Sequence, residues 1–316
     1  MSATTLTDAE KEDVQVVLRD CKYWLAVCRG PQARRPCVIT LALLGVMIGV
    51  YYVAGEGSTP GDSAKALIYR PGPDQDWYRS LSAMFSHVND EHLWMNSIML
   101  FLLGGLFELT EGIVHTGCCV WAGGTLGFAL HGVHSPNTLV RGMSGAIYAI
   151  MFAQVSLLAL NWKEMPGRWG RLFIIGVLGG VDIVGFMLWR SERTSYAAHC
   201  FGALAGICVA LVLGKNVRLR KWEISMTWAG CGGYAALVAT ALIGEQTSAG
   251  LLAGALLPVL VGYALWLTPH AMRLECCKPD HEMAPGMANQ QVSIAGVEEG
   301  VNSKQVRDME KALQTM

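Results

Sequence analysis

Charged residues are scarce in this sequence. Asp, Glu, Lys and Arg make up 16% of its 316 residues, against about 25% in typical soluble domains. Acids and bases nearly cancel, and the net charge of −1 gives no electrostatic case for binding nucleic acid. The ten cysteines lack the paired CxxC spacing of zinc sites. These absences disfavour a water-soluble fold, a nucleic-acid partner and a metal site.

Long apolar runs are what the sequence has instead. Hydrophobic residues amount to 52% of the chain and fall in blocks nearly free of Asp, Glu, Lys and Arg. A bilayer core about 30 Å thick takes roughly 20 helical residues to cross, and a helix satisfies its own backbone hydrogen bonds in lipid. The sequence therefore predicts an all-α polytopic membrane protein. Its eight expected spans are 36–55, 93–109, 112–134, 142–162, 172–189, 194–214, 224–244 and 249–267.

The basic residues predict an orientation. When the N-terminus is placed in the cytosol, most Lys and Arg of the connecting segments lie on the cytosolic side, as the positive-inside rule requires. Residues 1–35 then form a cytosolic N-terminal tail, and the polar residues 271–316 form a disordered cytosolic tail. Residues 77–87 mix aromatic, aliphatic and polar side chains, which predicts an element lying in the outer interface.

Polar groups inside the apolar blocks are the candidates for chemistry, because lipid makes them costly. Ser144 lies in the sequence Gly-Met-Ser-Gly at 142–145, and His199 begins a His-x-x-Gly pattern in the sixth block. Both are expected about one turn below the outer surface. An imidazole that takes the proton of a hydroxyl turns it into a nucleophile. Each motif alone also fits helix packing, since small residues and Ser are common at helix contacts. Gly202 and Gly206, four residues apart, lie on one helical face and are expected to let another helix come close.

Two further polar residues are expected at the same depth. His92 and Asn96 are four residues apart, a spacing that places both side chains on one helical face. There they could donate hydrogen bonds to an oxyanion, together with backbone N–H groups near Ser144. Four polar groups at one depth amount to a constellation that no single motif would justify.

Over roughly residues 70–222 the chain resembles the rhomboid intramembrane serine proteases. Three patterns of that family occur here in the same order: His-x-x-x-Asn, GxSG and His-x-x-Gly-x-x-x-Gly. The residues that match them are His92 and Asn96, Gly142, Ser144 and Gly145, and His199, Gly202 and Gly206.

Other positions follow the family less uniformly. The family Tyr that packs on the catalytic His corresponds to Tyr148, and the acid that closes the second span corresponds to Glu108. In the first loop, Arg79 is at the expected distance before His87, but Trp77 is displaced by one residue relative to the family's Trp-Arg pair. The first loop is therefore where the sequence departs from the family pattern.

The resemblance implies a Ser144–His199 dyad without cofactor or metal. It implies an oxyanion hole formed by His92, Asn96 and the backbone N–H of Ser144. Asp182 has no place in that scheme and is interpreted as a packed acid.

The resemblance also implies a domain plan. A rhomboid-like six-helix core would occupy residues 36–222. One or two added C-terminal spans would follow in residues 223–270, as in the secretase-type animal members of the family.

The leading hypothesis is a serine endopeptidase that cleaves single-span membrane proteins near the outer or lumenal face and releases their ectodomains. Its setting would be the lipid bilayer of the secretory pathway or the plasma membrane. The alternative is a catalytically inactive rhomboid-like protein that binds membrane clients and controls their trafficking. A transporter is disfavoured, because the sequence has no internal repeat and no pair of broken helices.

Overall fold

The computed structural model describes ten stretches of the chain. These are residues 37–55, 61–72, 76, 78–162, 165, 167–189, 195–214, 221–245, 254–256 and 260. The expected tails at 1–35 and 271–316 lie outside them, as do Trp77 and nearly all of the expected eighth span.

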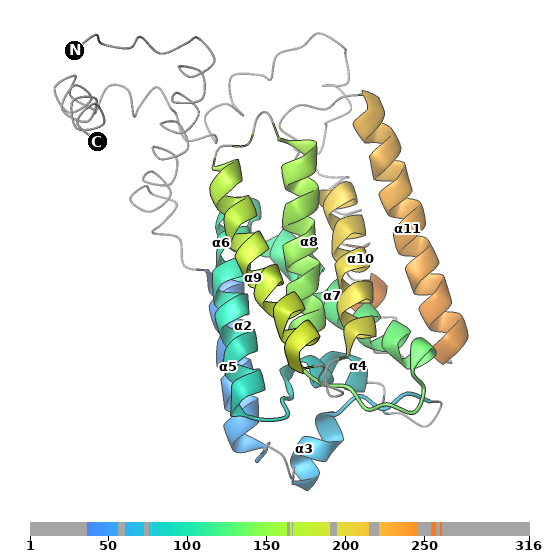
Figure 1. Cartoon of the computed structure of the whole chain (residues 1–316). Coiled ribbons are helices and arrows are strands. Elements are labelled where there is room, and N and C mark those ends of the chain that lie inside the picture. Colours follow the sequence, from blue (N-terminus) through green and yellow to red (C-terminus); the bar gives the residue numbers. More distant parts are fainter. Residues whose placement is uncertain are drawn as a thin grey trace, which may run out of the picture. The chain divides into compact units, whose positions relative to one another are not determined.

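Within the described residues the fold is helical, and only one isolated β-bridge, between Tyr69 and Val140, occurs. Figure 1 shows the helices as a bundle. They are α2 (Val38–Val53), α3 (Asp62–Leu67), α4 (Arg79–Ser82), η1 (Ala83–Phe85), α5 (Asp90–Met99), η2 (Leu100–Gly104), α6 (Gly105–Glu111), α7 (Ile113–His134), α8 (Ser144–Leu160), α9 (Arg168–Trp189), α10 (Tyr196–Leu213) and α11 (Lys221–Glu245).

Several of these helices have the length and composition of membrane spans. Four described runs, Asp90–Glu111, Ile113–His134, Tyr196–Leu213 and Trp222–Gly244, are long and apolar enough to cross a bilayer. The helices α2 and α8 are apolar but shorter. The prediction of an all-α polytopic membrane protein is therefore confirmed.

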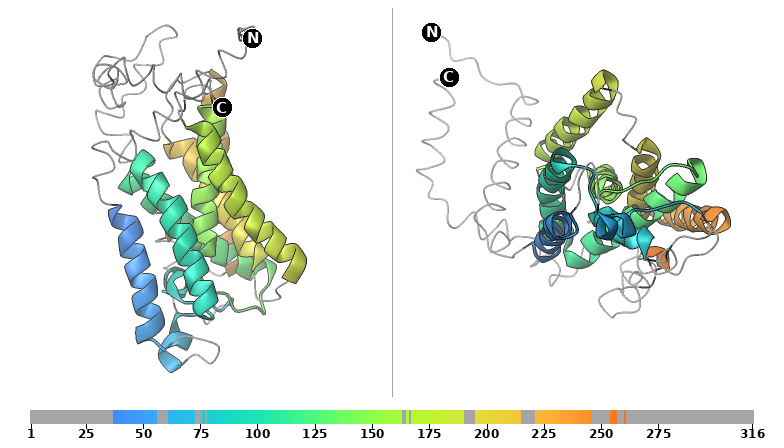
Figure 2. Two further views of the ribbon diagram at one scale, coloured as in Figure 1. Left: turned by 60° about the vertical axis from the view of Figure 1, so that its left-hand side comes forward. Right: turned by 90° about the horizontal axis from the view of Figure 1, so that it is seen from below.

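The centre of the bundle is formed by α7, α8 and α10, which make the most extensive contacts with one another. On one side of this centre lie α2 and the run from α5 to α6, and on the other lies α11 (Figure 1). Figure 2 shows α9 at the edge of the bundle. Because α8 and α10 are both central, residues at their outer ends are brought together.

Glycines allow α8 and α10 to touch along their backbones. A Cβ on Gly202 would collide with the carbonyl oxygen of Gly145, and one on Gly206 would come within 2.6 Å of the carbonyl carbon of Ala149. Small residues are common where membrane helices approach this closely, because backbone contact replaces side-chain interdigitation.

The second span is interrupted. Between α5 and α6 the five residues of η2 form a π-helical turn, a feature that loosens the regular hydrogen-bond ladder. The carbonyl oxygen of Leu103, in this turn, accepts a hydrogen bond of 3.1 Å from Nε2 of Gln154 on α8. The π turn is thus fixed to the centre of the bundle by a buried side chain.

Glu108 attaches the first span to the second. Its carboxylate accepts hydrogen bonds from the backbone N–H groups of Ile39 and Thr40, at 3.0 and 2.9 Å, and from Oγ1 of Thr40 at 2.7 Å. These N–H groups begin α2, where a helix has unpaired donors and a partial positive charge. Glu108 therefore caps a neighbouring helix while buried in the bundle.

Candidate active site

Ser144 and His199 lie in direct contact. Ser144 is the first residue of α8, and His199 lies in the first turn of α10. Nε2 of His199 lies 2.8 Å from Oγ of Ser144, the distance of a good hydrogen bond. The imidazole is 6% exposed. A hydroxyl in this position can lose its proton to the imidazole as it attacks an electrophile.

Aromatic rings hold the imidazole from two sides. The ring of Tyr148, one turn after Ser144, is stacked on His199 with a centroid distance of 4.4 Å and an interplanar angle of 15°. The ring of Tyr196 meets His199 edge-on at 6.0 Å. These contacts restrict the orientation in which the imidazole can accept a proton.

The side chains of His92 and Asn96 approach Gly142. A Cβ on Gly142 would lie 2.6 Å from Cε1 and 2.9 Å from Nε2 of His92, and 3.6 Å from Nδ2 of Asn96. Gly142 also has a φ of +120°, a conformation that glycine adopts at little cost. The absence of a side chain at position 142 therefore lets both polar groups reach the segment that leads into Ser144.

Asn96 has hydrogen-bonding capacity to spare. Its side chain is 4% exposed, and its Nδ2 has no hydrogen-bond partner among the residues that the structure describes. Buried donors are nearly always paired, so this group is available to an oxygen bound near Gly142.

The outer loop before α5 is organised by Arg79. NH1 of Arg79 donates to the carbonyl oxygens of Lys65 and Ile68, both at 2.9 Å, and the guanidinium forms an ion pair with Asp76 at 2.8 Å. Further along this loop, the ring of His87 packs edge-on against His92 at a centroid distance of 5.1 Å. Burial, together with the smaller effect of the nearby His92, lowers the pKa of His87 to about 3.

A second serine–histidine contact was not anticipated from the sequence. Ser195 accepts a hydrogen bond from the N–H of Ala198 as the N-cap of α10, and its Oγ lies 2.6 Å from Nδ1 of His131 on α7. The sequence contained a signal for the cap, because Ser is a preferred N-cap residue. The contact with His131 spans 64 positions and had no sequence signal.

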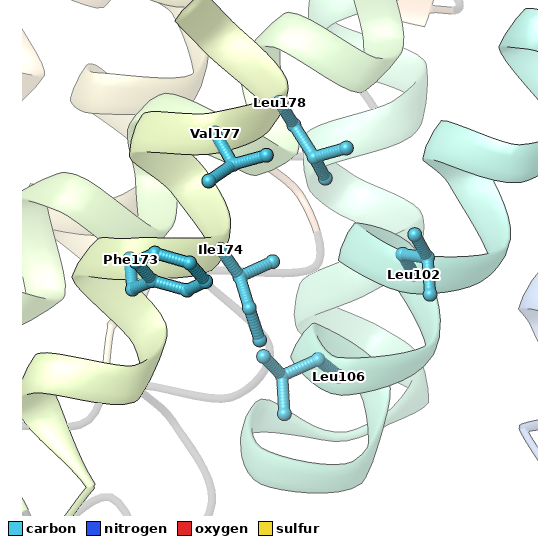
Figure 3. Close-up of a pocket in the computed structure, with 6 residues that line it drawn as sticks. All are labelled: Leu102, Leu106, Phe173, Ile174, Val177 and Leu178. Atoms are coloured by element: carbon cyan, nitrogen blue, oxygen red, sulfur yellow. The ribbon is translucent and has the colours of Figure 1, made fainter.

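An apolar groove lies beside the second span. Figure 3 shows Leu102 and Leu106, from η2 and α6, facing α9. Its volume is about 350 Å³, and four side chains of α9 complete its lining: Phe173, Ile174, Val177 and Leu178. Leu102 and Leu106 belong to the same helical run as His92 and Asn96, so the groove lies further toward the cytosolic side than these two residues in the predicted orientation.

The structure thus brings together His92, Asn96, Gly142, Ser144 and His199. The remaining family-matched residues surround or support this group. Gly145, Gly202 and Gly206 lie in the α8–α10 contact, Tyr148 stacks on the imidazole of His199, and Glu108 of α6 accepts hydrogen bonds from the start of α2. Asp182 belongs to α9, but its side chain lies outside the described residues.

Comparison with known proteins gives a consistent picture. A family model described as the rhomboid domain matches residues 74–216, a range that contains every residue of the site. Rhomboid-related protein 1 of Caenorhabditis elegans is 32% identical over 182 residues, covering 56% of this chain and 51% of that protein.

Two further relatives are more distant. Rhomboid-related protein 3 of Homo sapiens is 26% identical over 60% of this chain and 51% of its own length. Rhomboid-type serine protease 2 of Emericella nidulans is 28% identical over 53% of this chain and 32% of its own length. The matched regions therefore cover about half or less of these relatives.

Proposed function

Because this chain belongs to the rhomboid family, we propose that it is an intramembrane serine endopeptidase. The proposal rests above all on the 2.8 Å contact between Nε2 of His199 and Oγ of Ser144. His199 takes the hydroxyl proton while Ser144 attacks a peptide carbonyl, and then gives that proton to the departing amine. Water hydrolyses the resulting ester in a second step that uses His199 again as the base.

The tetrahedral intermediate needs donors for its oxyanion. In this proposal they are Nδ2 of Asn96, the imidazole of His92 and the backbone N–H of Ser144. Two observations support this assignment: Asn96 Nδ2 has no partner in the part of the chain that the structure describes, and both side chains lie close to Gly142. Donors already in place gain strength in a low-dielectric site and need no reorganisation during the reaction.

The substrates in this proposal are single-span membrane proteins, cut near the outer or lumenal face so that their ectodomains are released. A peptide bond inside an intact helix is protected by its hydrogen bonds, so the substrate must unwind locally at the cut. The apolar groove beside the second span has a lining compatible with an apolar transmembrane segment.

The surrounding topology belongs to the same proposal. The N-terminus is cytosolic, residues 36–222 form the six-span catalytic core, residues 223–270 add one or two spans, and the protein works in the secretory pathway or plasma membrane. The concentration of Lys and Arg in the connections assigned to the cytosol supports this orientation.

Co-expression with a tagged single-span substrate tests the proposal. Wild type should release the ectodomain, whereas Ser144→Ala and His199→Ala should reduce release at least about a hundredfold, since each removes a partner of the proton transfer. Ser156→Ala is the matched control. Ser156 lies on the same helix as Ser144, and its hydroxyl donates to the carbonyl oxygen of Phe152, so release should persist.

Equal release by wild type and both dyad variants would contradict the proposal. Failure of wild type to cleave any of a panel of single-span proteins would favour client binding instead.

A further inference from the structure

His131 occupies a position between the two chain segments that carry the dyad. It lies in the last turns of α7 and is 3% exposed. Its Nδ1 is 2.6 Å from Oγ of Ser195, and its Nε2 is 3.4 Å from the carbonyl oxygen of Thr138. Both contacts use ring nitrogens, so the imidazole bridges two separate parts of the chain.

The direction of these hydrogen bonds follows from the partners. A carbonyl oxygen can only accept, so Nε2 of a neutral His131 carries the proton and Nδ1 accepts from the Ser195 hydroxyl. The same hydroxyl oxygen accepts from the N–H of Ala198 at 3.2 Å. A continuous chain of donors and acceptors therefore runs from Thr138 through His131 and Ser195 into the first turn of α10.

Each end of this chain lies close to one member of the dyad. Ser195 precedes His199 by one helical turn, and its carbonyl oxygen accepts from the N–H of His199 at 3.2 Å. Thr138 precedes Ser144 by six residues in the connection between α7 and α8. Movement of α10 relative to that connection would change the distance between Ser144 and His199.

Backbone contact and ring stacking hold α8 against α10 near the dyad. At Gly145 and Gly202 the two helices meet through backbone, without interlocking side chains. A contact of this kind permits close approach. The hydrogen bonds of His131 add a restraint of fixed direction at the end of α10, where Ser195 begins the helix.

We propose that His131 is a positioning residue, which holds the Ser195 end of α10 in register with the connection that leads to Ser144. This inference rests on the proposed function. His131 does not touch the reacting atoms. It acts through Ser195 and Thr138 on the distance over which the proton is transferred.

The test measures cleavage of a single-span substrate by the purified full-length chain. Each kcat is divided by the fraction of the variant that is folded, taken from thermal unfolding, so that loss of folding is not counted as loss of activity. His131→Ala should lower kcat by about tenfold to a hundredfold, since displacements of around 1 Å at a reacting pair cost about that much. KM should stay within about twofold, because His131 is buried and belongs neither to the apolar groove nor to the proposed oxyanion hole. His134→Ala is the control, since His134 is exposed in the same helical turn, and it should keep the wild-type kcat.

A double-mutant cycle identifies the contact itself. Ser195→Ala should lower kcat like His131→Ala, the double variant should lower it no further, and Ser195→Thr should restore it because the hydroxyl is kept. If His131→Ala does not fold, the comparison of Ser195→Ala with Ser195→Thr tests the same hydrogen bond.

Three outcomes would overturn the inference: a His131→Ala kcat within twofold of wild type, additive losses in the double variant, or a Ser195→Thr variant as slow as Ser195→Ala. Absence of cleavage by wild type is a different result. It would refute the proposed function, and this inference with it.

Discussion

At the residue scale, Gly142 explains why the first glycine of the Gly-Met-Ser-Gly sequence matters. The motif places Ser144 close to two glycines, but the reason why position 142 is a glycine lies on a different helix. A Cβ at position 142 would collide with His92, and the backbone there has a positive φ. The collision involves a residue 50 positions earlier in the chain, so the pattern could indicate the position without indicating its partner.

His131 illustrates what sequence patterns leave out. It was one of several histidines in an apolar block, and nothing near it in sequence indicated a role. Its significance depends on Ser195, which reaches it only after α7 and α10 have packed. Long-range polar contacts of this type have no spacing rule, whereas contacts within one helix do.

His87 predicts a pH dependence of stability. It lies in the loop before α5, outside the membrane-spanning helices, and burial lowers its pKa from 6.5 to about 3. The folded protein therefore holds this imidazole neutral, while the unfolded chain binds a proton below about pH 6.5. The stabilisation is complete above that pH and is lost progressively as the pH falls toward 3, by roughly 2 kcal/mol between pH 6.5 and pH 5.

Thermal unfolding in detergent at pH 7 and pH 5 measures this effect. The loss of stability on acidification should be clearly smaller in His87→Gln than in wild type, because the amide does not titrate. His134→Gln, which changes an exposed histidine, should leave the wild-type loss intact. Identical acid sensitivity in wild type and His87→Gln would contradict the assignment.

At the scale of elements, the glycine spacing of α10 was the strongest packing signal in the sequence. Gly202 and Gly206 were expected to permit a close helix contact, and the structure shows both against the backbone of α8. A period of four residues selects one face of a helix, which is why this contact could be predicted. The sequence indicated the helix of Ser144 as the partner of α10 only because Ser144 and His199 were expected at the same depth.

Gly206→Ala tests that contact. The new methyl group would meet the Ala149 backbone, which cannot move aside as a flexible side chain can. Overpacking of this kind should destabilise the protein by about 1 to 3 kcal/mol and lower activity by separating α8 from α10. The measurement is thermal unfolding together with substrate cleavage.

The matched control is Gly49→Ala on α2, where nothing lies within 4 Å of the new Cβ. Alanine in an open helical position should be neutral or slightly stabilising. Similar losses for Gly206→Ala and Gly49→Ala would contradict this prediction, because Gly49 has no neighbour for the new methyl group to meet.

The π turn within the second span could not be predicted. The sequence 93–109 reads as one uninterrupted apolar helix, and no Pro marks a break. The extra residue in the turn is accommodated by a tertiary hydrogen bond from Gln154 to Leu103. A feature stabilised by a partner 51 positions away leaves no pattern of its own.

At the scale of the whole molecule, the scarcity of charge was the most informative property. It indicated the solvent of the protein and therefore its helical fold, because lipid excludes other open structures. It also made the few polar groups within the spans conspicuous, and three of them, His92, Asn96 and His199, converge around Ser144. The expected eighth span and both tails lie almost entirely outside the described residues, so the domain plan stays a prediction.

The central claim is that Ser144 is a nucleophile activated by His199 in the intact protein. Reaction of a fluorophosphonate probe with the full-length chain in native membranes, with the adduct located by mass spectrometry, tests it most directly. The account predicts an adduct on Ser144, none in Ser144→Ala, and labelling at least about a hundredfold slower in His199→Ala. No adduct, an adduct on a different serine, or equal labelling of wild type and His199→Ala would contradict it.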